Sequence, residues 1–112
     1  HITVEKLGEF IANLHNKGVY FRSIHLGNVV MTPDGTVGLI DMADMKIYRK
    51  PLTKSLRIRN FKHLTKYAED RALLISDKNG QELLNAYLEE MSLPDKYREP
   101  ISTALLTALQ KN

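Results

Sequence analysis

The sequence contains no cysteine and has no apolar run of membrane-spanning length. Without cysteine the chain cannot form disulfide bonds or thiolate metal sites, which fits a reducing compartment. A transmembrane helix would need about 18 consecutive apolar residues. The first ten residues, HITVEKLGEF, also lack the basic start and apolar block of a secretory signal peptide. We therefore expect a cytoplasmic protein that does not span a membrane.

The chain has 112 residues, which suits one small domain and leaves little room for a second. Its apolar share of 43% is ordinary for a domain with a hydrophobic core. The sequence begins with a histidine instead of an initiator methionine. We expect a single unit, residues 1–112, that is a fragment of a longer protein.

Acidic residues are missing from one stretch of the chain. The net charge is only +3, but residues 46–66 contain eight basic side chains and no acidic one. These are Lys46, Arg49, Lys50, Lys54, Arg57, Arg59, Lys62 and Lys66. Such a cluster can bind phosphate, nucleic acid or anionic lipid headgroups. The alternative is a solvated helix face beside a partner domain.

Hydrophobic spacing predicts a helix over residues 3–17, with Thr3 as its N-cap and Gly18 as its stop. His15, near the end of this helix, is most simply a capping residue that suits the helix dipole. Residues 19–27 are expected to form a loop. Two short apolar runs around TPDG then predict a β-hairpin over residues 28–40.

The rest of the chain is expected to be mostly helical. Residues 42–52 are interpreted as irregular, and SDKNG (residues 76–80) as a loop. Helices are predicted over residues 53–67, 69–75, 81–91 and 95–110. Pro100 predicts a kink or break in the last helix unless the first helical turn begins near it.

One motif contains candidate catalytic residues. FRSIHLGNVV, residues 21–30, follows the spacing of the kinase catalytic loop H-R-D-x-x-x-x-N. Phe21 falls at the His position, Arg22 at the Arg, Ser23 at the Asp and Asn28 at the Asn. Thirteen residues later, Asp41 stands where the aspartate of D-F-G is found, although the tripeptide here is DMA.

Together with HLGN and the later RIRN, this pattern resembles the C-terminal lobe of the protein-kinase-like fold. It is most similar to bacterial lipopolysaccharide core (heptose or Kdo) kinases, over roughly residues 5 to 70. The resemblance implies an α+β, mainly α fold: a helix, a catalytic-type loop, a short β-hairpin, then three or four helices. It also implies an N-terminal nucleotide-binding lobe, which the sequence lacks.

The resemblance further implies a Mg²⁺-ATP-dependent sugar kinase of the EC 2.7 type once that lobe is present. Asn28 and Asp41 would hold Mg²⁺ and the nucleotide, because amide and carboxylate oxygens suit a hard cation. Arg22 and His25 would support the loop or the phosphate. The basic residues would receive an anionic saccharide or lipid, with peripheral contact at the inner membrane. Those residues are Lys46, Arg49, Lys50, Arg57 and Arg59.

Ser23 leaves two interpretations open. A serine hydroxyl is a poor base at neutral pH, and general-base assistance is worth roughly 10²–10⁴-fold in rate. An active enzyme would need a substitute base such as His25 or Asp44. The alternative is a pseudokinase, a binding or regulatory module with the same fold. A basic nucleic-acid-binding domain is disfavoured, because it needs neither the hairpin nor the Asn28–Asp41 spacing.

Overall fold

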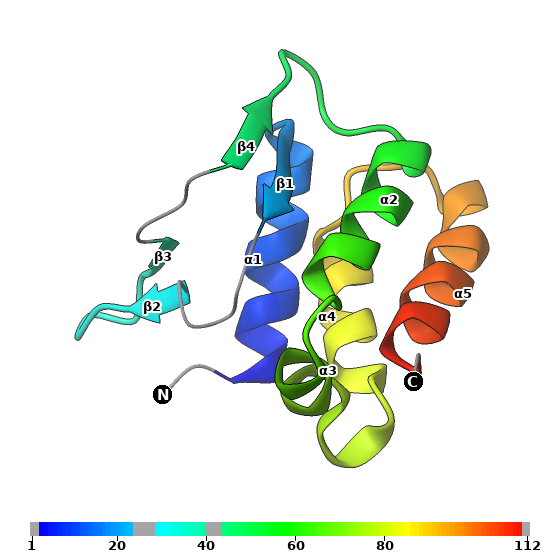
Figure 1. The fold of residues 1–112 in the computed structure, drawn as a ribbon. Helices are drawn as coiled ribbons and strands as arrows, with labels where there is room; N and C mark the ends of the chain where they lie inside the picture. Colours follow the sequence, from blue (N-terminus) through cyan, green and yellow to red (C-terminus); the bar gives the residue numbers. More distant parts are fainter. Residues whose placement is uncertain (1–2, 24–28, 40–43, 111–112) are drawn as a thin grey trace.

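The computed structural model describes residues 3–23, 29–39 and 44–110, and they form an α+β, mainly helical fold (Figure 1). This confirms the expected class. The elements are α1 (Val4–Asn16), β1 (Val19–Ser23), β2 (Val29–Met31), β3 (Val37–Leu39), β4 (Asp44–Ile47), α2 (Lys54–Leu64), α3 (Ala68–Ile75), η2 (Ser76–Lys78), α4 (Gln81–Glu90), η3 (Asp95–Tyr97) and α5 (Arg98–Leu109). Helices α1, α2, α4 and α5 lie beside one another, and the four short strands lie along one side of this group.

Helix α1 begins where the sequence places its cap. The Thr3 hydroxyl accepts a hydrogen bond from the Lys6 N–H at 3.1 Å, which satisfies one of the free donors of the first turn. Leu7 and Ile11 are buried against α4, the helix with which α1 makes its most extensive contact. The two helices meet closely at Gly8, where an added Cβ would lie 2.6 Å from the Leu83 carbonyl oxygen. A side chain there would force the helices apart.

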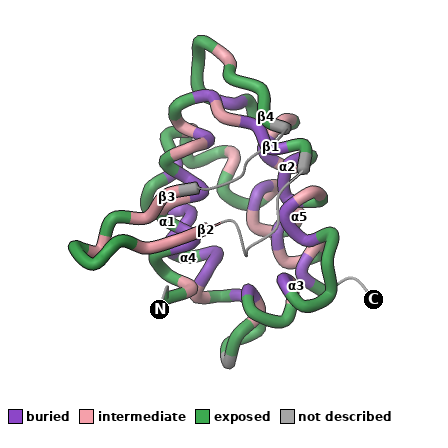
Figure 2. The backbone as a smooth tube through the Cα atoms, turned by 60° about the vertical axis from the view of Figure 1, so that its left-hand side comes forward, coloured by how far each residue is buried: buried purple, intermediate pink, exposed green. Residues whose placement is uncertain are grey.

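The hydrophobic core lies between the helices, and Figure 2 shows the buried positions on their inward faces. Helix α4 contributes Leu83, Leu84, Tyr87 and Leu88 to it. Helix α5 adds Ile101, Leu105 and Leu109, spaced by four residues so that they share one face. The β2–β3 hairpin projects from this body, and its described side chains are half-buried or exposed.

The strands form two separate antiparallel pairs. Strands β2 and β3 make the predicted hairpin, in which Val29 faces Leu39. The other pair, β1 with β4, corrects two expectations: residues 19–27 do not begin as a loop, and residues 42–52 are not irregular throughout. Tyr20 faces Lys46 and Phe21 faces Met45 in this second pair, so the chain returns to β1 after the hairpin.

The later helices differ from the predicted ranges mainly at their ends. Helix α2 ends at Leu64, and the segment expected as a loop over residues 76–80 contains the short helix η2. No break occurs at Pro100, because α5 begins only two residues earlier at Arg98. Proline is tolerated in a first turn, where its missing N–H has no partner within the helix.

His15 is a core residue and not the helix-capping residue that the sequence predicted. It is fully buried, with Nε2 lying 2.9 Å from Asn60 Oδ1 and Nδ1 lying 2.7 Å from the Tyr87 hydroxyl. Asn60 also accepts the Phe21 N–H at 3.2 Å and donates Nδ2 to the Phe21 carbonyl at 2.6 Å. Because Asn60 Oδ1 can only accept, His15 Nε2 carries the proton and Nδ1 accepts from Tyr87.

This buried group shifts two ionisation equilibria. Burial, with a further contribution from the nearby Arg57 charge, lowers the pKa of His15 to about 3. Burial also raises the pKa of Tyr87 to about 12. Both side chains are therefore neutral in the folded protein at neutral pH.

In the part of the chain that the structure describes, no helix is both long enough and apolar enough to cross a membrane.

Replacing Asn60 with alanine should lower the free energy of unfolding by about 3 kcal/mol. The substitution leaves the Phe21 N–H, the Phe21 carbonyl and His15 Nε2 buried without their partner, and each unsatisfied group costs about 1–3 kcal/mol. Urea unfolding followed by circular dichroism measures the loss. Arg59→Ala, one residue earlier and exposed, is the matched control and should change stability by less than about 0.5 kcal/mol. Equal effects of the two changes would contradict the role given to Asn60.

Stability should fall as the pH is lowered from about 6.5 towards 3, the range between the unfolded and folded pKa values of His15. Above this range His15 is neutral in both states, so its contribution is complete. Within the range only the unfolded chain takes up the proton, so stability falls by up to about 1.4 kcal/mol per pH unit.

The free energy of urea unfolding at about pH 7.5, 6 and 5 tests this expectation in the wild type and in His15→Gln. The difference between the two proteins isolates the histidine from the carboxylates, which titrate in both. A difference that does not vary with pH would show that His15 has the same pKa in the folded and unfolded states, which would contradict the lowered folded-state value.

Candidate functional site

The motif covers the end of β1, the start of β2 and two connections between the strand pairs. Residues 24–28 join β1 to β2, and residues 40–43 join β3 to β4. Ser23 is paired with Asp44, and Val29 is paired with Leu39. The start of each connection therefore lies beside the end of the other. His25, Asn28 and Asp41 lie outside the described residues, so the predicted metal and nucleotide site is defined here by the strand ends that border it.

The hairpin between these connections is closed by a well-bonded turn. The Thr32 N–H donates to the Thr36 carbonyl at 2.8 Å, and the Gly35 N–H donates to the Thr32 carbonyl at 2.9 Å. The Asp34 carboxylate accepts from the Thr32 hydroxyl and from the Thr36 N–H. These bonds lower the pKa of Asp34 below its ordinary value. Gly35 has a φ of +88°, a conformation that other residues rarely adopt.

Phe21 occupies the motif's histidine position and packs into the hydrophobic core, fully buried. Its backbone is held at the same time by the Asn60 side chain. Arg22, next along β1, is exposed. Ser23 is the last residue of β1 and follows an irregularity in the register with β4.

Of the five basic residues expected to receive an anion, four are exposed. Lys46 lies on β4, and its ammonium group is 5.0 Å from the centre of the Tyr48 ring. Arg49 and Lys50 follow in the connection to α2, whereas Arg59 lies on α2 itself. Lys46, Arg49 and Lys50 are thus neighbours along the chain, at β4 and just after it.

Arg57 is placed differently from the other four, because its side chain is fully buried. Its guanidinium donates to the Leu52 carbonyl at 2.8 Å, to Asn16 Oδ1 at 3.2 Å, and to the hydroxyls of Tyr87 and Ser92 at 3.4 Å each. All four acceptors are neutral. The sequence expected a surface cation, but here the guanidinium ties α2 to α1 and α4.

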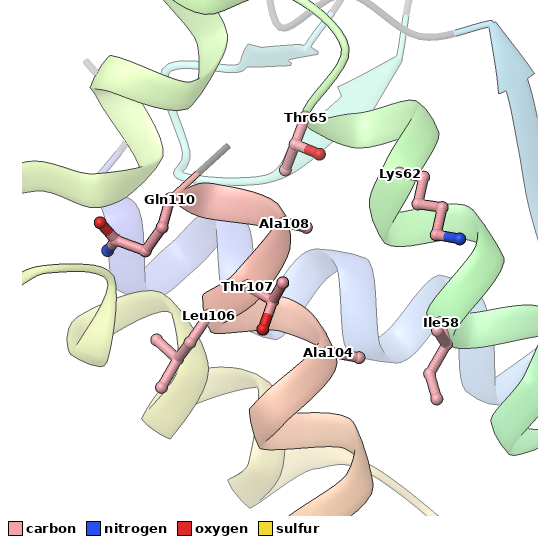
Figure 3. Close-up of a pocket in the computed structure, with 8 residues that line it drawn as sticks. All are labelled: Ile58, Lys62, Thr65, Ala104, Leu106, Thr107, Ala108 and Gln110. Carbon is pink, nitrogen blue, oxygen red and sulfur yellow. The ribbon is translucent and has the colours of Figure 1, made fainter. Parts of the chain in front are cut away.

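Two surface hollows accompany these elements. One, of about 880 Å³, lies between α2 and α5 (Figure 3). Ala104 and Ala108 point from α5 towards α2 there, and Lys62 is its only charged lining residue within the described chain. The other, of about 790 Å³, is bordered by β2, α3 and the start of α1, and includes Val29, Glu5 and Glu82. The second hollow adjoins the β2–β3 hairpin, as does a smaller one of about 200 Å³ that Gly35 and Val37 border together with α1.

Among residues 3–23, 29–39 and 44–110, no cluster of three or more His, Asp or Glu side chains could hold a metal ion. Comparison with models of protein families, with curated proteins and with solved structures gave no significant match. The arrangement around the motif therefore has to be interpreted from its own residues.

The roles of His15 and Asn60 in fixing β1 were not predicted from the sequence. Asn60 was noted only as part of the RIRN stretch, and His15 only as a helix cap. A signal for the β1–β4 pair was present, because VYFR and MKIY are rich in β-branched and aromatic residues. Asn60 offered no such signal, since a single asparagine in a helix gives no indication of a partner 39 residues earlier.

Replacing Gly35 with alanine should weaken the hairpin by about 1–2 kcal/mol, the usual cost of left-handed backbone in a residue with a Cβ. Gly38→Ala is the matched control, because an added Cβ there has nothing within 4 Å and no positive φ. Hydrogen exchange of the Thr32 amide, read by NMR, should accelerate roughly tenfold only in the Gly35 variant. The same acceleration in both variants would rule out the left-handed turn as its cause.

Proposed function

We propose that residues 1–112 are the C-terminal lobe of a kinase-like phosphotransferase related to lipopolysaccharide core sugar kinases. The observation that carries the proposal is the pairing of Val29 with Leu39 at the open end of the hairpin. Asn28 directly precedes Val29 in the chain, and Asp41 follows Leu39 by two residues. The two oxygen-bearing residues of the motif are thus attached to the same end of one hairpin.

The order of the elements also supports the proposal. A helix, the motif segment, a hairpin and several helices follow one another, as the resemblance implies. The β1–β4 pair adds a reason for the motif segment to be held in place, because Ser23 at its start is paired with Asp44. Phe21 fixes that segment from below by packing into the core.

The donor set fits a magnesium–nucleotide complex, since an amide oxygen and a carboxylate are ligands that Mg²⁺ accepts. When bound, the metal would neutralise negative charge on the transferred phosphate. In the proposed enzyme Asn28 and Asp41 hold this complex, and the nucleotide base is bound by an N-terminal lobe. Arg22 and His25 steady the loop or the phosphate. Lys46, Arg49, Lys50 and Arg59 attract the anionic saccharide or lipid acceptor.

Ser23 favours a second candidate, a pseudokinase of the same fold. A hydroxyl cannot take the acceptor's proton at neutral pH as a carboxylate would. In this alternative the lobe binds its ligands and regulates a partner, with little or no phosphate transfer.

Phosphate transfer from ATP to a lipopolysaccharide core saccharide distinguishes these candidates. The assay uses the polypeptide that contains these residues together with the N-terminal lobe that the proposal requires. Asp41→Ala should abolish Mg²⁺-dependent transfer, whereas Glu89→Ala, an exposed carboxylate on α4, should leave it unchanged. Ser23→Asp should raise the rate by about 10²-fold or more if only the base is missing.

Transfer that is undiminished in Asp41→Ala would contradict the proposed metal site. Binding of Mg²⁺-ATP without transfer in the wild type, with transfer appearing in Ser23→Asp, would establish the pseudokinase. The absence of both nucleotide binding and transfer would exclude both candidates.

A further inference from the structure

The two edges of the β1–β4 sheet differ in whether their outward backbone groups are hydrogen-bonded. On the β1 edge, the Asn60 side chain accepts the Phe21 N–H and donates to the Phe21 carbonyl. An asparagine amide used in this way replaces the next strand of a sheet. The β1 edge at Phe21 is therefore closed, and no further strand can pair with that residue.

The direction of these bonds fixes which backbone groups of β4 face outward. In an antiparallel pair, facing residues either exchange both hydrogen bonds or exchange none. Phe21 directs both of its groups to Asn60, so Phe21 and its partner Met45 form a non-hydrogen-bonded pair. The pattern alternates along the strand, so Ile47, which faces Val19, also directs its N–H and carbonyl away from β1. The alternation predicts that the next pair, Gly18 with Tyr48, is hydrogen-bonded. The Tyr48 N–H does donate to the Gly18 carbonyl, at 2.8 Å.

Met45 and Ile47 thus offer two N–H groups and two carbonyls at the outer edge of β4. Apart from the ladder itself, neither residue hydrogen-bonds to any other part of the described chain. Their apolar side chains are also exposed, by 42% at Met45 and by 68% at Ile47. These side chains share one face of the strand, because they are two residues apart. An uncovered edge with apolar side chains is a template for another strand.

Charge decides which strand fits. Lys46 lies between the two apolar residues in the sequence and on the opposite face of the strand. Arg49 and Lys50 follow after Tyr48. All three side chains are exposed, and none of them has an acidic partner among the described residues. A second copy of this chain would bring the same cations face to face, which destabilises cross-strand pairs. An extended segment with acidic and apolar residues in alternation would satisfy both faces.

We propose that β4 is a docking edge for an extended acidic segment of a partner protein, which adds a third strand through Met45 and Ile47. Main-chain hydrogen bonds supply affinity in this mode of recognition, and alternate side chains supply specificity. The segment's apolar residues pack beside Met45 and Ile47, while its carboxylates face Lys46, Arg49 and Lys50. The proposal does not depend on phosphate transfer, so it stands or falls separately from the proposed function.

Fluorescence anisotropy with two labelled peptides tests the proposal. One peptide alternates glutamate with valine, and its matched control of equal length alternates lysine with valine. The acidic peptide should bind at least about tenfold more tightly than the basic one. No binding of the acidic peptide at millimolar concentration, or equal binding of both, would overturn the docking edge.

Two variants separate strand pairing from simple charge attraction. Ile47→Pro removes one outward N–H but no hydrogen bond of the β1–β4 ladder, and it should weaken acidic-peptide binding about tenfold or more. Ile47→Thr keeps the N–H and is its matched control, with a smaller loss. The double change Lys46→Glu and Arg49→Glu should reverse the preference, so that the basic peptide binds better. This reversal tests the charge argument even if the proline variant fails to fold.

Other occupants of this edge give different results. Sedimentation velocity would detect a dimer of the chain. A dimer that Ile47→Pro abolishes would show that the β4 edge binds a second copy of this chain, and it would overturn the proposal of an acidic partner segment. Binding to anionic phospholipid vesicles that is unaffected by Ile47→Pro would overturn strand pairing in favour of a membrane surface.

Discussion

The bond pair between Asn60 and the Phe21 backbone is the constraint on which the rest of this structure depends. It attaches β1 to α2, and α2 is fixed in turn to α1 and α4 through Arg57. Because Asn60 Oδ1 also accepts from His15, one amide joins a strand, a helix and the buried histidine. An amide can serve all three because its oxygen has two acceptor sites and its nitrogen is a donor.

The same amide determines how the surface can be used. By occupying both backbone groups of Phe21, it closes one edge of the small sheet and sets the hydrogen-bonding phase of the other. It also holds the start of the motif segment, since Ser23 comes two residues after Phe21. The buried hydrogen-bond network and the closed edge at Phe21 are thus consequences of a single side-chain orientation.

The sequence predicted what depends on local pattern and missed what depends on distant pairing. Helix α1 could be located from the spacing of Leu7 and Ile11 and from its cap at Thr3, and the β2–β3 hairpin from Pro33, Asp34 and Gly35. Each of these signals lies within a few residues of the structure it specifies. The β1–β4 pair joins segments that are more than twenty residues apart in the sequence. The strand-like composition of each segment does not indicate which other segment it pairs with.

Arg57 shows why charge alone could not locate the candidate anion site. In the sequence it is one of eight equivalent cations, and nothing nearby distinguishes it from Arg59. The two side chains lie on different faces of α2, and only the fold decides which face meets Leu52, Asn16 and Tyr87. Burial of a guanidinium needs several hydrogen-bond acceptors at once, and those acceptors come from three separate segments. A cation in a basic stretch can therefore be a structural residue. Three of the exposed cations, Lys46, Arg49 and Lys50, lie on β4 or within three residues of its end.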